Sequence, residues 1–145
     1  MTKDARFGFF LEVLGTTTVA LGSTSTIVPE GTVAKSFDLV GNALQALGSA
    51  YVSEVEKLGL LKTASAIASA GNLINLSALI SNTTETEQAL LIMKGDLFQA
   101  TGVALNLALT SKEENPLIRS ANFLQFIGNC LEALAEIGDY KIKII

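Results

Sequence analysis

Apolar residues recur along this chain at the spacing of helices, and the strict alternation typical of strands is rare. The two prolines, Pro29 and Pro116, fall where a loop would run or a helix would begin. The pattern predicts five helices, at about residues 4–22, 34–57, 62–81, 85–110 and 116–138. We therefore expect an all-α fold, in which residues 1–145 form a single domain, a bundle of five antiparallel helices.

Short signals mark where some of these helices begin and end. Thr84 and Glu87 have the spacing of a capping box, and Asn115 before Pro116 has that of an N-cap with proline in the first helical position. The segment 23–36 is rich in turn-forming residues and predicts a long loop. The tail 141–145 alternates charged residues with isoleucine and predicts a short extended segment.

An eight-residue unit recurs once in each predicted helix, and its clearest copy is GNALQALG at residues 41–48. The unit begins with glycine, has a large apolar residue at position four and an amide or carboxylate at position five, and ends with glycine or alanine. Each glycine inside a helix destabilises it by about 0.8–1.0 kcal/mol relative to alanine. A repeated glycine in every helix therefore needs a compensating contact.

Close packing of helices would supply that contact, because positions one and eight are two turns apart and lie on one helix face. The glycines expected at these crossings are Gly8, Gly15, Gly41, Gly48, Gly71, Gly95, Gly102 and Gly128. The large residues at position four are expected to pack in the central layer of the bundle; they are Leu11, Leu44, Ile74, Phe98 and Leu131.

A thin polar stripe runs beside the glycines, because position five lies only 40° from position one on a helical wheel. Its candidate residues are those at position five, Glu12, Gln45, Asn75, Gln99 and Glu132. The stripe also comprises the polar residues at position two, Asn42, Asn72, Asp96 and Asn129. The stripe has two alternative placements. We expect the stripe either to face solvent, where it would keep the bundle soluble, or to form hydrogen bonds between helices. Facing inward, it would line a cavity for a small polar ligand or a cation, since buried polar groups need partners.

The rest of each helix is apolar almost all round, which leaves a small monomer with more apolar surface than it can bury. Association into a homo-oligomer, with a protein partner or with a membrane would cover this surface. Residues 63–84 lack charges for 22 positions and are long enough to span a bilayer. Serine and asparagine dilute their hydrophobicity, and no aromatic belt flanks them, so membrane association is the alternative to a soluble bundle.

The composition excludes several kinds of chemistry. The net charge is −4 and the ten basic residues are scattered, so we expect no nucleic acid partner. The chain has no histidine and one cysteine, Cys130, which excludes Ser-His-Asp and Cys-His nucleophiles, histidine-bound zinc and an internal disulfide. No phosphate-binding or dinucleotide-binding glycine motif occurs. We expect no catalytic residue, no metal, no cofactor and a reducing, cytoplasmic location.

The unit at residues 41–48 resembles that of an uncharacterised family of small repetitive proteins from spore-forming Gram-positive bacteria. The first copy departs from the pattern, with Phe9, Phe10 and Glu12 in place of a version that contains tryptophan and glutamine. The resemblance implies a bacterial origin and a helical repeat, and it implies no active site.

Together these features predict a non-enzymatic structural or protein-interaction protein that works through its helical surface. Two alternatives remain open, a helical bundle that binds a small ligand and a membrane-active or membrane-associated protein.

Overall fold

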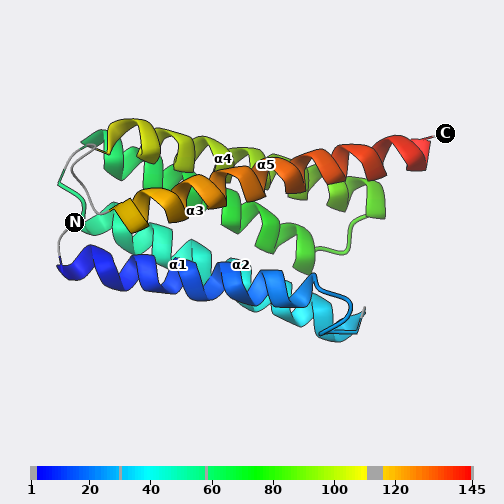
Figure 1. The fold of residues 1–145 in the computed structure, drawn as a ribbon. Helices are drawn as coiled ribbons and strands as arrows, with labels where there is room; N and C mark the ends of the chain where they lie inside the picture. The colour runs from blue at the N-terminus through cyan, green and yellow to red at the C-terminus, as the bar shows by residue number, and fades with distance from the viewer. Residues whose placement is uncertain (1–2, 30, 58, 111–115, 145) are drawn as a thin grey trace.

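The computed structural model describes residues 1–145 except 1–2, 30, 58, 111–115 and 145. Within this part the chain forms five helices and no strand, which confirms the predicted all-α class (Figure 1). The helices are α1 (Lys3–Gly22), α2 (Thr32–Val55), α3 (Gly59–Ile80), α4 (Glu85–Leu109) and α5 (Pro116–Ile144).

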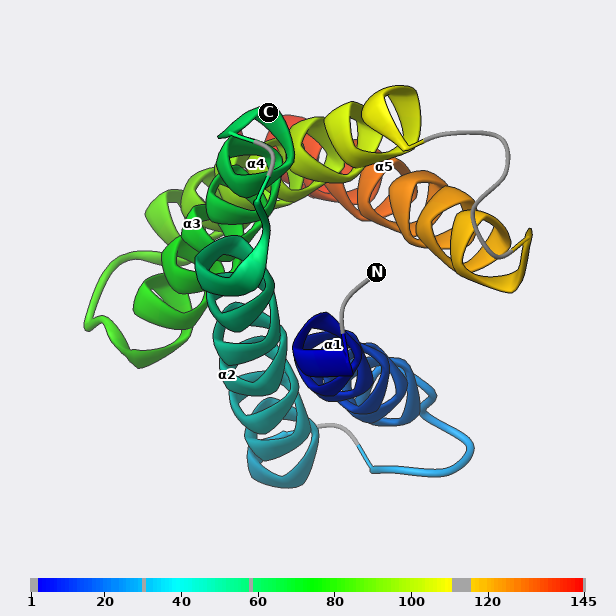
Figure 2. The same cartoon turned by 90° about the vertical axis from the view of Figure 1, so that its left-hand side faces the viewer.

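Each helix packs antiparallel against the next one in the chain: α1 on α2, α2 on α3, α3 on α4 and α4 on α5. Within the described residues α1 and α5 do not contact each other. Viewed along the bundle, the five helices therefore form an open arc whose two ends are α1 and α5 (Figure 2). We call the side of the bundle between these two helices the seam.

The start of α4 follows the predicted capping box. The Thr84 hydroxyl accepts a hydrogen bond from the Glu87 backbone N–H at 3.3 Å, and the Thr84 N–H donates to the Glu87 carboxylate at 3.0 Å. Two N–H groups at the helix start are thereby satisfied. Pro116 is the first residue of α5, as predicted, while its predicted cap, Asn115, lies outside the described residues.

Two boundaries differ from the prediction. Helix α2 begins at Thr32, inside the predicted loop 23–36. Gly31, with a φ of 108°, completes the turn before it, and no glycine or proline follows in the first two turns of the helix. The tail predicted as extended is helical to Ile144. After Gly138 no glycine or proline interrupts α5, and an alternation of only a few residues does not outweigh the continuation of a long helix.

The interior is built from small side chains, and its buried apolar residues are mostly alanines. The predicted central layer of large residues is wrong for Phe98 and Leu131, which are 48% and 60% exposed. Leu11, Leu44 and Ile74 are half-buried. Helices that approach at glycine and alanine leave no room for large side chains between them, so these side chains turn outward.

A polar cavity inside the bundle

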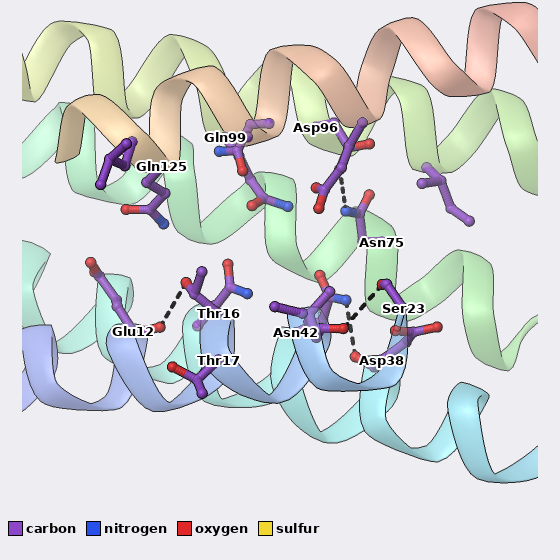
Figure 3. Close-up of a pocket in the computed structure, with 18 of the residues that line it drawn as sticks. Glu12, Thr16, Thr17, Ser23, Asp38, Asn42, Asn75, Asp96, Gln99 and Gln125 are labelled. Carbon is purple, nitrogen blue, oxygen red and sulfur yellow. Dashed lines mark hydrogen bonds between the residues drawn. The ribbon is translucent and has the colours of Figure 1, made fainter. Parts of the chain in front are cut away.

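A cavity of about 600 Å³ lies inside the arc and is lined by side chains from all five helices (Figure 3). Its polar lining combines carboxylates, amides and hydroxyls. The apolar part of the wall includes Phe9, Val13, Val19, Leu79, Ile92 and Leu124.

Close helix contacts shape the wall on the α1–α2 and α3–α4 sides. A methyl group added to Gly48 would lie 2.5 Å from the Gly8 carbonyl oxygen, and one added to Gly71 would lie 2.5 Å from the Gly95 carbonyl oxygen. The same tight approach joins Gly15 to Gly41, and Gly102 to Ala64 and Ala68. These contacts bring the backbones together at seven of the eight glycines named from the sequence.

Gly128 does not belong to this group, because nothing lies within 4 Å of a methyl group added there. The expected crossing at Gly128 is wrong. This glycine lines the cavity instead, where α5 borders open space.

The polar stripe faces inward and not towards solvent, and its Asn75 amide pairs between helices with Asp96 of α4. Gln45, Asn75 and Gln99 are 6%, 5% and 3% exposed, and all three line the cavity. Glu12 is half-buried, and Glu132 is open to the cavity from α5. The structure thus brings all five candidate residues to one cavity.

The position-two residues of the stripe are buried as well; they are Asn42, Asn72, Asp96 and Asn129. Asn42, Asp96 and Asn129 also line the cavity, whereas Asn72 does not. Their place in the repeated unit is the sequence signal for both sets. Asp38 and Glu136, which line the cavity from outside the unit, carry no such signal.

The buried polar side chains are only partly satisfied by one another. The Asn75 amide donates to Asp96 Oδ1 at 2.7 Å, a contact between α3 and α4 (Figure 3). The Asn42 amide donates to the Asp38 carbonyl at 2.9 Å, and the Ser49 hydroxyl donates to the Glu12 carboxylate. Among the described side chains, four buried polar atoms have no hydrogen-bond partner: Asn72 Oδ1, Asn75 Oδ1, Asp96 Oδ2 and Asn129 Nδ2. Such atoms are rare in native proteins and call for a missing partner.

The cavity is lined by acidic side chains. Five carboxylates line it, and none of its described lining residues is lysine or arginine; the five are Glu12, Asp38, Asp96, Glu132 and Glu136. Asp96 is repelled by Glu132 and Glu136, which lie close enough to interact with it. The described residues contain no group of three or more acidic, cysteine or histidine side chains able to hold a metal ion.

The outer surface has the opposite character. Large apolar side chains are exposed on every helix; they include Phe10, Val40, Leu47, Leu60, Leu73, Ile80, Leu97, Phe123, Leu131 and Leu134. Among the described residues, amides and a carboxylate are thus buried together with alanines, while large apolar side chains are exposed, whereas in water large apolar side chains are usually the buried ones.

Comparisons with known proteins add a family and no function. No curated protein matches the chain, and no solved structure does. Residues 3–143, nearly the whole chain, match a family of unknown function, and the protein belongs to that family, DUF6944.

Proposed function

We propose that this protein is a membrane-inserted helical bundle that encloses a polar cavity, with its apolar outer surface in contact with lipid. The observation that carries the proposal is the inverted distribution of side chains. A single protein partner would cover one face, whereas the exposed apolar residues occur on all five helices. Lipid surrounds a protein on every side and suits such a surface.

The lengths of the helices fit a bilayer. Helices α1 to α4 contain 20 to 25 residues and are roughly 30–38 Å long at 1.5 Å per residue. The hydrocarbon core of a bilayer is about 30 Å thick. Among the described helices, only α3 is long and apolar enough to cross a membrane by length and hydropathy alone, with a mean hydropathy of 1.3. Each of the other helices contains at least three charged residues, which lower this average, whereas α3 contains one.

Charges outside the cavity are concentrated near helix ends, where headgroups and water would lie. Arg6, Lys35 and Lys62 are each the fourth residue of a helix, and Glu54 is the next to last residue of α2. Among the described residues Lys94 is an exception, since it is exposed ten residues into α4. A long lysine side chain in such a position can extend its ammonium towards the interface.

Outward hydroxyl groups are satisfied within their own helices. The Thr101 hydroxyl donates to the Leu97 carbonyl at 2.7 Å, and the Thr63 hydroxyl donates to the Gly59 carbonyl at 2.9 Å. Hydroxyls bonded in this way carry no unsatisfied donor into lipid. This supports a lipid-facing role for those surfaces.

We propose no catalytic role for the cavity. Its reactive groups are carboxylates, amides and hydroxyls, and the chain has no histidine to activate a hydroxyl. Binding or passage of a polar solute suits this lining better than covalent chemistry does.

Fractionation of cells that express the full chain tests the proposal. We expect the protein in the membrane fraction, resistant to high salt and alkaline carbonate, and released as a monodisperse species by a mild detergent. A discrete oligomer in detergent-free buffer would overturn the proposal. In that outcome copies of this chain would cover the apolar surface, as a homo-oligomeric interaction protein requires.

A further inference from the structure

The chemistry of the cavity points to a class of ligand. Asp96 is 1% exposed, and among the described residues its carboxylate accepts one hydrogen bond, from the Asn75 amide to Oδ1. A buried carboxylate without a cationic partner is strongly destabilising. Glu132 and Glu136 add repulsion to the same place. A positively charged ligand would relieve both effects.

One unsatisfied oxygen supplies a further observation. Asp96 lines the cavity, and its Oδ2 is buried without a hydrogen-bond partner. An ionised carboxylate oxygen is an acceptor, so the partner it lacks carries hydrogen-bond donors or positive charge. Asn75 Oδ1 also has no partner, but it lies against Gly95 in the contact between α3 and α4. In Figure 3 the two side chains meet at one point of the wall, where α4 and α3 lie side by side.

The rest of the wall distinguishes an organic cation from a metal ion. Phe9, Val19, Ile92 and Leu124 give the cavity a large apolar share. A volume of about 600 Å³ lies within the range of small-molecule sites, roughly 300–1,000 Å³. The described residues offer no acidic group of the kind that holds a metal ion. Apolar walls around an acidic centre suit a cation that carries hydrocarbon.

We propose that this cavity is a binding site for an amphipathic organic cation, held by Asp96, Glu132 and Glu12 and enclosed by the apolar wall residues. Glu12 and Glu132 come from α1 and α5, the two helices that border the seam. They would meet the cation as it enters through the seam, with Asp96 deeper in the wall. This inference goes beyond membrane insertion, since the cavity exists whatever covers the outer surface.

The test uses tetraphenylphosphonium as the probe and tetraphenylborate, of nearly the same size and opposite charge, as the control. Equilibrium dialysis measures binding of each ion to the purified full chain. Binding to empty detergent micelles is measured separately and subtracted, or the dialysis is run in plain buffer if the protein needs no detergent. We expect saturable binding of one cation per chain and no saturable binding of the anion.

Isosteric variants identify the site. We expect Asp96→Asn and Glu132→Gln each to weaken binding by about tenfold, the loss of one nearby charge. Glu54→Gln, at an exposed site outside the cavity, is the matched control and should leave the affinity unchanged. Circular dichroism checks the fold. If Asp96→Asn does not fold, the affinity of Glu132→Gln for the cation tests the site by itself. Glu132 is exposed, so we expect this variant to fold.

Three results would overturn the proposal: no saturable binding of the cation, equal binding of the cation and the anion, or affinity unchanged by both variants. Sodium or calcium ions could also displace the probe at lower concentrations than the probe itself. That result would overturn the proposal of an organic cation and indicate an inorganic cation site. None of these results depends on whether the protein enters a membrane.

Discussion

At the scale of single residues, glycine decides how closely the helices approach. Gly48 and Gly8 lie backbone to backbone, and so do Gly71 and Gly95. The same close approach holds small residues at the interfaces and turns large ones outward. The amide and carboxylate beside each glycine then have no solvent to face, and they line the cavity.

Gly48→Ala should destabilise the protein by about 1–3 kcal/mol, because the new methyl group would overlap the Gly8 carbonyl, which a helix backbone cannot easily move aside. Gly128→Ala is the matched control, since its methyl group meets open space. There we expect no loss, or a gain of up to about 1 kcal/mol from helix propensity. Unfolding followed by circular dichroism measures both. Equal effects at the two positions would show that close backbone contact is not what glycine provides.

At the scale of helices, local signals such as caps and prolines set where a helix begins. The repeated eight-residue unit sets which residues share a helix face. The capping box of α4 forms as the sequence predicts, and Pro116 opens α5. Helices α1 to α4 are close to the thickness of a bilayer in length, and each has a small-residue face, a polar face and an apolar face.

Removing the cap of α4 with Thr84→Ala should lower the free energy of unfolding by about 1 kcal/mol, since the Glu87 N–H loses its acceptor. Thr83→Ala, at the neighbouring exposed position, is the control and should have little effect. Chemical unfolding of both variants provides the comparison. A loss confined to Thr83→Ala would contradict the observed cap.

At the scale of the whole molecule, the inverted distribution of polar and apolar residues is the dominant feature. Five helices in an open arc place carboxylates and amides around one cavity and large apolar side chains around the outside. In water such a monomer would expose far more apolar surface than soluble proteins tolerate. Lipid around the bundle removes that difficulty.

Leu97→Lys tests this distribution directly. Leu97 is 47% exposed at the middle of α4, where lipid contact makes a lysine unfavourable by about 2.5–3.5 kcal/mol and should reduce the membrane-integrated fraction. Leu109→Lys, at the end of the same helix, is the matched control and should be tolerated near the interface. Fractionation after expression measures both. If both variants instead improve solubility in buffer, the outer surface faces water.

The sequence by itself determined the fold class, the five helices and most of their ends, because helical periodicity, caps and prolines act locally. It also indicated the glycines and the residues of the polar stripe, since both follow from the repeated unit. The path of α5 past Gly138 was missed, because no local signal separates a short extended tail from a continuing helix.

Only the tertiary structure decided which way the stripe faces. The pattern of one helix is equally compatible with a polar face towards water and one towards a cavity. The choice depends on which face packs, and the glycines settle it by bringing Gly48 against Gly8 and Gly71 against Gly95. Residues such as Asp38 and Glu136 join the cavity only through the arc of all five helices, which no single segment encodes.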